Sequence, residues 1–259
     1  MQLEQFVSLL EAIAPLKLAE EWDNVGVLLA PGKPRSVRTV LLTIDLTERV
    51  MDEALEHGAQ AIVAYHPPIW TGLKRLLPEH RTGRLLLRAV EHHLTIYSPH
   101  TALDAAAGGV NDWLSDAFDA AERRAILPTL DSTGVGQGRW LRLHTPLPLT
   151  SAVERIKRHL GLARVRLAEA CSEVTTVALC AGAGGSVVQR ATADLYLTGE
   201  MRHHDVLHAK ETGTSVVLTD HTHCERGYLP SLQEKLASSS SGALRVVISK
   251  KDEDPLRIV

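Results

Sequence analysis

The chain has few cysteines, no run of basic residues and no apolar stretch long enough to cross a membrane. Its 259 residues include three cysteines, Cys171, Cys180 and Cys224, and none belongs to a C-x-x-C pair. An odd, widely spaced set argues against a disulfide framework and against a cysteine zinc knuckle, and it is typical of proteins in a reducing compartment. We therefore expect a cytoplasmic protein that does not enter the membrane.

Charge and composition also exclude several classes of protein. The net charge is −3, and 44% of the residues are hydrophobic and 23% charged, as in an ordinary globular protein. Because no cationic segment stands out, direct binding to nucleic acid is not expected. Residues 1–16 have the pattern of an amphipathic helix with two glutamates, and they lack the basic start of a secretory signal and the arginine-rich bias of a transit peptide.

Strand and helix patterns alternate along most of the chain. Short runs rich in Val, Ile and Leu predict strands over 37–45, 59–66, 94–100, 139–145, 163–169, 175–180, 194–199, 215–220 and 244–249. Helical patterns between them include residues 48–57, which Thr47 can cap, and a segment that begins with a Ser151/Glu154 capping box and ends at Gly161. This alternation predicts an α/β protein with largely parallel or mixed sheets flanked by helices.

A glycine-rich segment in the middle of the chain predicts a domain boundary. Residues 127–138 contain three glycines together with serine and threonine, a composition that is typical of turns. We therefore expect two lobes, an N-terminal α/β lobe over 1–126 and a C-terminal α/β lobe over 139–259, joined by this linker.

Three of the predicted strands end at a histidine, and two of those histidines have a carboxylate four residues later. AQAIVAYH ends at His66, LTIYSPH ends at His100 before Asp104, and TSVVLTDH ends at His221 before Glu225. Ligands of open α/β sheets bind beyond the carboxyl ends of the strands. Imidazole and carboxylate groups together suit zinc, iron(II) or manganese, and the mixture does not select among them. The sequence therefore predicts a divalent-metal site at these strand ends.

Each cluster taken alone has a simpler interpretation. Glu225 can be an acidic residue at a helix N-terminus, the segment SPHTALD can be a Ser-Pro turn, and His66 can end an ordinary strand that two prolines stiffen. In the second cluster either His100 or Asp104 could bind the metal while the other orients it. The occurrence of three such strand ends in one chain favours the metal interpretation.

Two further motifs have weaker chemical signals. In ALCAGAGGS a strand runs into a glycine-rich turn that could cradle a phosphate, although a tight strand-to-helix turn is the simpler interpretation. GEMRHHD places Glu200 and His204 on one face if it is helical, and such a face is more often solvated than functional. The chain has neither a serine nucleophile elbow nor a catalytic-cysteine pattern, so its catalytic residues stay unassigned.

Seven ordered blocks of the sequence match the pattern of one known family. They are EEWDNVG at 20–26, TIDLT at 43–47, YHPPIW at 65–70, SPHTALDAAAGGVNDWL at 98–114, VALCAGAGGS at 177–186, DLYLTGEMRHHD at 194–205 and TDHTHCERGYLP at 219–230. With these blocks the chain resembles the NIF-three-like family, the GTP cyclohydrolase type 2 homologs. The resemblance implies a two-lobed α/β subunit that assembles into a homohexameric ring, with a dinuclear metal site facing the interior of the ring.

The resemblance also implies a particular set of metal ligands. These are His66, Asp104, His221 and Glu225, so the family favours Asp104 over His100. Bacterial members commonly have a His-His pair where this chain has Tyr65-His66, and the YHPP form resembles the eukaryotic branch. Because a neutral phenol is a much poorer ligand than imidazole, we expect one or two ions, with the second one weak, substituted or absent.

Two classes of function fit these expectations. The first is a metal-dependent hydrolase of a nucleotide-like or other small substrate, in which the ion would activate water and His100, Tyr65 or His204 could move protons. GTP as the substrate rests on the family naming alone. The second is a non-catalytic metal-binding assembly or a protein partner of transcriptional regulators. An open coordination position would favour the first class, and a closed shell of four protein ligands the second.

A (β/α)₈ metallohydrolase is a third alternative, because it also displays ligands at strand ends. Such enzymes often carry H-x-H on their first strand, whereas the one H-x-H of this chain, His221 and His223, lies late in the sequence. This alternative therefore ranks well below the other two.

Overall fold

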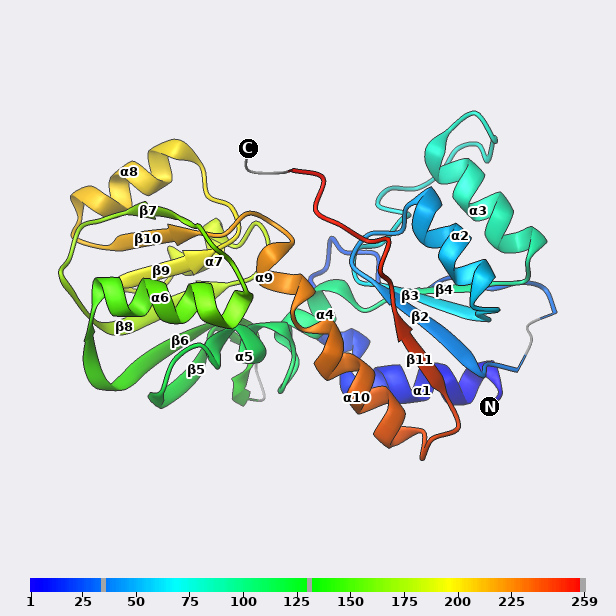
Figure 1. Ribbon diagram of the computed structural model, residues 1–259, viewed down its shortest axis with the longest axis horizontal. Coiled ribbons are helices and arrows are strands. Elements are labelled where there is room, and N and C mark those ends of the chain that lie inside the picture. The colour runs from blue at the N-terminus through cyan, green and yellow to red at the C-terminus, as the bar shows by residue number, and fades with distance from the viewer. Residues whose placement is uncertain (34–35, 130–131, 257–259) are drawn as a thin grey trace. The chain divides into compact units, whose positions relative to one another are not determined.

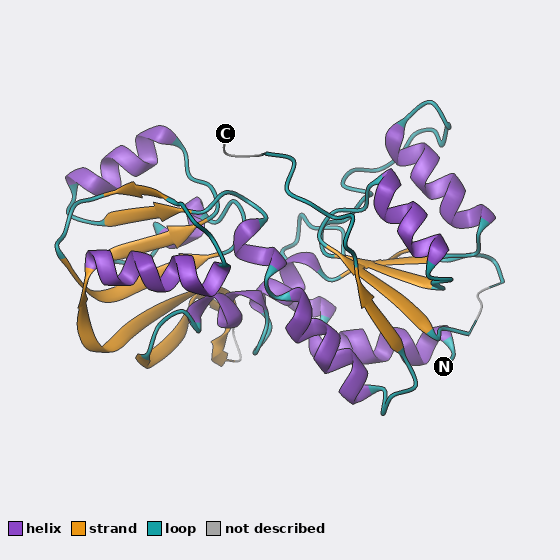
Figure 2. Ribbon diagram, in the orientation of Figure 1, coloured by secondary structure: helices purple, strands orange, loops and turns teal. Residues whose placement is uncertain are grey.

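The computed structural model describes residues 1–33, 36–129 and 132–256, and it divides the chain into two units. Unit 1 comprises Met1–Leu103 and Leu229–Val259, and unit 2 comprises Asp104–Tyr228. Each unit has its own sheet flanked by helices (Figure 1, Figure 2). The predicted α/β class, with mixed sheets and helices beside them, is therefore confirmed.

The sheet of unit 1 is parallel except at one edge. Its order is β1-β4-β3-β2-β11, with β1 antiparallel to β4 and all other neighbours parallel. The strands are β1 (Gly26–Leu29), β2 (Thr39–Thr43), β3 (Ala61–Ala64), β4 (Thr95–Ser98) and β11 (Arg245–Ile248). β3 and β4 are buried at every position, and the burial of β3 explains why its sequence, AIVA, is apolar without alternation.

Helices cover both faces of this sheet. α2 (Glu48–Glu56) and α3 (Arg81–Glu91) lie on one face, and α1 (Leu3–Ile13) and α10 (Leu229–Ser239) lie on the other (Figure 1). A short 3₁₀ helix (Leu16–Leu18) follows α1. The core between the sheet and the first helix pair contains Leu41, Met51, Ile62, Leu85 and Ile96. The oxygen of Thr47 accepts a hydrogen bond from the N–H of Val50 at 3.3 Å, which confirms the predicted cap of α2.

The sheet of unit 2 is mixed. Its order is β5-β6-β8-β9-β10-β7, in which β8, β9 and β10 are parallel and the other pairs are antiparallel. The strands are β5 (Ala120–Thr129), β6 (Ser132–Pro148), β7 (Arg166–Ala168), β8 (Glu173–Cys180), β9 (Leu195–Thr198) and β10 (Ser215–Leu218). The helices are α5 (Val110–Ser115), α6 (Leu149–Leu160), α7 (Gly185–Val188), α8 (His203–Glu211) and α9 (His223–Arg226). Unit 2 also includes the last two residues of α4 (His100–Ala105), because it begins at Asp104.

The segment expected to link two lobes forms a hairpin instead. Residues 127–138 lie in the paired ends of β5 and β6, apart from residues 130–131, which lie outside the described part of the chain. A Cβ atom on Gly136 would come within 2.0 Å of the carbonyl oxygen of Leu127. The glycine therefore permits close strand pairing at a position that the sequence pattern presented as flexible. The division falls at 103/104 and 228/229, because the C-terminal segment returns to place β11 beside β2.

One predicted helix start was wrong. α6 begins at Leu149 after Pro148, so Ser151 lies inside the helix and does not cap it. The predicted end was right, because Gly161 terminates α6 with a φ of +67°.

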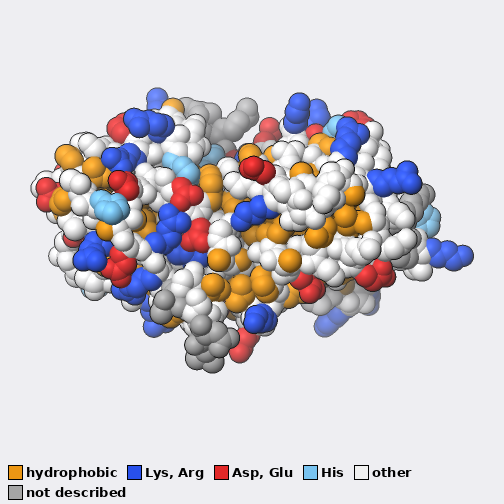
Figure 3. Space-filling model, turned by 90° about the horizontal axis from the view of Figure 1, so that it is seen from below, with side chains coloured by type: hydrophobic (Ala, Val, Ile, Leu, Met, Phe, Trp, Pro, Cys, Tyr) orange, Lys and Arg blue, Asp and Glu red, His pale blue; other side chains and the backbone are white. Residues whose placement is uncertain are grey.

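The lengths of the helices and the charges on the surface can be compared with the expectations from composition. Within residues 1–33, 36–129 and 132–256, every helix is too short or too polar to cross a membrane. On the face drawn in Figure 3, Lys and Arg side chains are interspersed with Asp and Glu side chains.

Candidate metal site

His66 lies directly after β3 in unit 1, where the sequence pattern placed it. Its Nδ1 atom is 3.1 Å from Oδ1 of Asp45, which follows the neighbouring strand β2. The backbone N–H of His66 donates to the carbonyl oxygen of Ile44 at 3.0 Å and extends the pairing of the two strands beyond their ends. A carboxylate at Nδ1 holds the ring and its tautomer, so that Nε2 becomes the nitrogen suited to bind a metal.

His221 has the same arrangement at the end of β10 in unit 2. Its Nδ1 atom is 3.2 Å from Oε2 of Glu200, which follows the parallel neighbour β9. Its Nε2 atom is 3.4 Å from Oε1 of Glu225, one helical turn later. The preceding residue, Asp220, has a φ of +64°, a conformation that aspartate tolerates better than most residues, and its Oδ1 is 3.1 Å from Nη2 of Arg166. The His221 ring therefore lies between two carboxylates.

Glu225 is buried, with 2% of its side chain exposed. Two glycines leave the space in which it meets His221. A Cβ atom on Gly182, whose φ is +60°, would lie 2.5 Å from Oε1 of Glu225 and 3.1 Å from Nε2 of His221. A Cβ atom on Gly199 would lie 2.9 Å from the Cα atom of His221. Gly182 belongs to the glycine-rich motif ALCAGAGGS, for which a tight strand-to-helix turn is the simpler interpretation. A glycine at this point of the turn leaves room for the contact between Glu225 and His221.

Asp104 lies on α4 and is 9% exposed. The side-chain amide of Asn111 donates to its carbonyl oxygen at 3.1 Å and accepts from the N–H of Ala181 at 2.9 Å, which ties α4 to the end of β8. Burial raises the pKa of the Cys180 thiol, and the negative charges of Asp104 and Glu225 raise it further. The two carboxylates therefore lie around the same buried thiol within unit 2.

The cysteines of this region, Cys180 and Cys224, are buried free thiols. Burial raises the pKa of Cys224 as well, and the charge of Glu225 adds to that effect. The sulfur of Cys224 accepts a hydrogen bond from the N–H of Gly182 at 3.1 Å. The burial that raises both pKa values disfavours the thiolate, which is the form that binds metals.

His100 is held by a carboxylate within unit 1. Its Nδ1 atom is 2.8 Å from both carboxylate oxygens of Asp23. Burial by itself would raise the pKa of Asp23, but hydrogen bonds from His100 and Thr101 outweigh this effect and lower the pKa below its usual range. His100 has a φ of +26°, an unusual value for a residue other than glycine.

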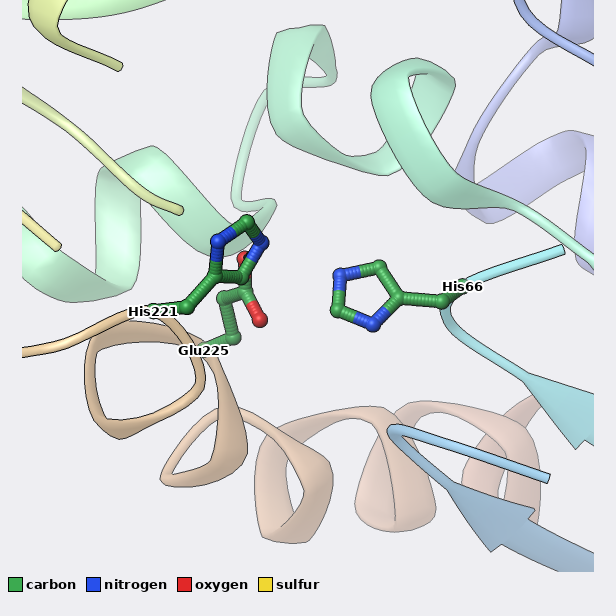
Figure 4. A group of neighbouring side chains, drawn as sticks. All are labelled: His66, His221 and Glu225. Carbon is green, nitrogen blue, oxygen red and sulfur yellow. Dashed lines mark ion pairs between the residues drawn. The ribbon is translucent and has the colours of Figure 1, made fainter. Parts of the chain in front are cut away.

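The candidate ligand set of the described residues has two imidazoles and one carboxylate. It consists of His66, His221 and Glu225 (Figure 4). This is the donor set of catalytic zinc sites with an open position and of non-haem iron sites, so the residue types fit a divalent transition metal. Asp104, the fourth predicted ligand, is outside this set.

Sequence reasoning missed the carboxylates that orient the histidines. Asp45 ends the predicted strand over 37–45, and His66 ends the next predicted strand. The contact between Asp45 and His66 depends on the register of β2 and β3, which the sequence does not give. Glu200 was assigned to a helix face with His204, whereas α8 begins at His203 and Glu200 precedes it, facing His221.

The sequence matches one family model over residues 1–255, that of Duf34/NIF3, NGG1p interacting factor 3. The chain belongs to the NIF3 family. It is 36% identical over 350 residues to NIF3-like protein 1 of Rattus norvegicus, with 100% of the chain and 93% of that relative covered. It is 43% identical over 261 residues to the NIF3 homolog of Schizosaccharomyces pombe, with 95% and 94% covered. The family resemblance drawn from the sequence blocks is therefore confirmed.

Solved structures show the same NIF3 fold. A Bacillus cereus protein related to NIF3 superposes with a TM-score of 0.86 at 23% identity, over 99% of this chain and 98% of that one. Reduced HcgD from Methanocaldococcus jannaschii superposes with a TM-score of 0.83 at 23% identity, over 96% and 98%. At this level of identity the likeness concerns the fold alone.

Proposed function

We propose that this NIF3-family protein binds one or two divalent ions of zinc, iron or manganese and uses them to hydrolyse a small, nucleotide-like substrate. The proposed ligands are His66, His221, Glu225 and Asp104. A bound ion of this kind polarises its substrate and lowers the pKa of water. The proposed ligands would hold and orient the ion.

The observation that carries the proposal is a repeated carboxylate–imidazole pair. Asp45 faces Nδ1 of His66 in unit 1, and Glu200 faces Nδ1 of His221 in unit 2. Metal-binding histidines usually donate their second N–H to such an acceptor, which fixes the ring and raises its basicity as a ligand. A histidine that does not bind a metal does not require an acceptor at Nδ1. In this chain such an acceptor is present at the ends of parallel strands in both units.

The burial of Glu225 supports a cation at the same place. A carboxylate that is 2% exposed has lost most of its hydration, and this loss is unfavourable unless an opposite charge lies close by. Its Oε1 atom points to Nε2 of His221, the nitrogen that the Glu200 contact reserves for a metal. A divalent ion bound by both groups would compensate the carboxylate charge.

The test is metal analysis of purified protein followed by turnover. We expect wild-type protein to retain transition metal and the double variant His221→Ala/Glu225→Ala to retain none. His144→Ala is the matched control, because His144 is an exposed histidine whose Nε2 atom is 3.9 Å from a carboxylate oxygen of Asp119. Metal-loaded wild-type protein should then hydrolyse a member of a nucleotide panel. Equal metal content in the double variant and the wild type would refute the site, and no turnover with any of the three metals would refute the hydrolase.

A second candidate function is that of a protein partner. A Saccharomyces cerevisiae relative, 34% identical over 284 residues with 99% of this chain covered, is named NGG1-interacting factor 3. In this chain, residues 71–80 are exposed throughout, and they include Leu73, Leu76 and Leu77 at 46%, 43% and 39% exposure. Exposed apolar side chains that are close together in a loop are typical of protein-binding surfaces.

The two candidates differ in their dependence on metal. A hydrolase loses activity when the ligands are removed, whereas a partner that binds through residues 71–80 keeps its binding in metal-free, folded protein. The homohexameric assembly and the cytoplasmic location stay predictions. Light scattering of the purified protein measures the first, and fractionation of cells that express the chain measures the second.

A further inference from the structure

Two tryptophans in unit 1 expose most of their side chains. Trp22, in the loop before β1, is 60% exposed, and Trp70, in the loop after β3, is 56% exposed. Their ring centroids are 5.5 Å apart and the ring planes are inclined by 43°. Tryptophan normally buries most of its large apolar surface, so two adjacent exposed indoles indicate a binding surface.

The loops that carry the two indoles are fixed by hydrogen bonds. The side-chain amide of Asn24 donates to the carbonyl oxygen of Ile69 at 2.7 Å, which joins the two loops beside the tryptophans. Asp23 accepts from the backbone N–H of Thr101 at 3.1 Å and binds Nδ1 of His100 at 2.8 Å. A surface held in this way before a ligand arrives loses little conformational entropy on binding.

His100 connects the tryptophan pair with a proposed metal ligand. Its ring centroid is 6.0 Å from that of Trp22, 5.6 Å from that of Trp70 and 5.4 Å from that of His66. All four rings belong to unit 1. The ring of His100 therefore neighbours both indoles and the ring of His66.

The indoles also offer hydrogen-bond donors. Among the described residues, neither Trp22 nor Trp70 has a partner for its Nε1–H, whereas the Nε1–H of Trp140 donates to the carbonyl oxygen of Thr192 at 3.0 Å. A ligand for this pair would combine a π face, for stacking, with acceptor atoms at its edge. Planar heteroaromatic rings with ring nitrogens or carbonyl groups have both properties.

We infer that Trp22 and Trp70 form the binding site for a planar heteroaromatic ring of purine size. Stacking of a base on an aromatic side chain is sequence-tolerant and substantial, and two indoles can engage a bicyclic ring. The role of this ring as part of the substrate rests on the function proposed above, whereas its binding does not. The inference therefore survives if the protein proves to have no hydrolase activity.

The experiment is a titration of adenosine into metal-depleted, folded protein, followed by the quenching of tryptophan fluorescence. We expect saturable quenching by adenosine and none by ribose. Trp22→Ala or Trp70→Ala should raise the dissociation constant about tenfold, the loss that corresponds to about 1.4 kcal/mol. Trp140→Phe is the control and should bind as the wild type does. Trp22→Phe and Trp70→Phe, which keep an aromatic face, should retain intermediate affinity and serve if the alanine variants fail to fold.

Three results of the binding experiments would overturn the inference, and a fourth, from light scattering, follows below. The first is no saturable quenching, and the second is unchanged affinity in both alanine variants. The third is binding of tetramethylammonium without binding of adenosine, which would make the pair a cation site. Metal content separates this inference from the proposed function. Trp22→Ala should retain metal like the wild type, and His221→Ala should bind adenosine like the wild type while losing metal.

If adenosine fails to bind and Trp22→Ala/Trp70→Ala lowers the mass of the assembly in light scattering, the pair is an interface between copies of the chain. That result would also overturn the inference.

Discussion

Asp45 Oδ1 lies 3.1 Å from Nδ1 of His66, and the two residues follow adjacent parallel strands of one sheet. Because the register of β2 and β3 brings both strand ends to the same edge, the carboxylate reaches the ring without an intervening loop. The pair resembles the contact between Glu200 and His221 at the end of β10 in the other unit. Each unit thus presents one oriented imidazole.

Asp45→Asn should weaken metal binding without removing it. The amide can still contact the ring, but it carries no negative charge to raise the basicity of His66, so affinity should fall by about 10–100-fold. Competition with a chromogenic chelator measures this change. Glu200→Gln should have an effect of similar size on His221. The exposed pair between Arg49 and Glu253 gives a control, since Glu253→Gln should leave metal affinity unchanged.

Gly182→Ala should also weaken metal binding, for a steric reason. The new methyl group would lie 2.5 Å from Oε1 of Glu225 and would displace it from His221. We expect a loss of affinity of at least about tenfold, comparable to the loss of an orienting carboxylate. Gly161→Ala is a matched control, because Gly161 has a φ of +67° and open space around it. It should reduce the free energy of unfolding by about 1 kcal/mol and leave metal affinity unchanged.

Arg139 should be important for the stability of unit 2. Its side chain is fully buried, its Nε–H donates to Oδ1 of Asp112 at 2.6 Å, and its Nη2–H donates to the carbonyl oxygen of Ala106 at 3.2 Å, just after α4. Arg139→Met leaves Asp112 without this charge, so the free energy of unfolding should fall by about 3–5 kcal/mol. Urea unfolding measures it. Arg123→Met, which removes a half-exposed pair with Asp116, should change it by about 0–1 kcal/mol.

Asp23 should contribute stability that depends on pH. Its pKa in the folded protein is lowered from the usual value of an aspartate, so the ionised form is the one that the fold favours. This contribution is fully present above the unfolded pKa and is lost as the pH falls through the lower, folded pKa. In metal-free protein, Asp23→Asn should therefore reduce the free energy of unfolding at pH 7, and the difference from wild type should shrink below about pH 4. A difference that grows towards acid pH would contradict this account of Asp23.

The sequence predicted the strands and the ends that carry His66 and His221, because parallel strands buried on both faces are continuous apolar runs. It also predicted the cap at Thr47 and the helix end at Gly161, which depend on local backbone chemistry. Features that depend on distant pairing were not predicted. Asp45 reaches His66 only through the register of two strands.

Two further features had no signal in the local sequence. They are the hairpin of β5 and β6 and the return of the C-terminal segment to unit 1. Gly136 lies in a segment with the composition of a linker, yet it permits the close approach of two paired strands. Pairing of β11 with β2 joins residues that are about two hundred positions apart in the chain. The residue pattern left His100 and Asp104 as alternative ligands, and the family resemblance favoured Asp104. The part of Asp104 in binding the metal stays a prediction.

The proposed function requires that both His66 and His221 bind the metal, and the metal content of single variants measures whether they do. Wild-type protein, His66→Ala, His221→Ala and His144→Ala would be purified in parallel and their transition-metal content determined. We expect His66→Ala and His221→Ala each to lose the metal while His144→Ala keeps it. Wild-type metal content in His66→Ala, together with its loss in His221→Ala, would remove His66 from the ligands and contradict the proposed metal site.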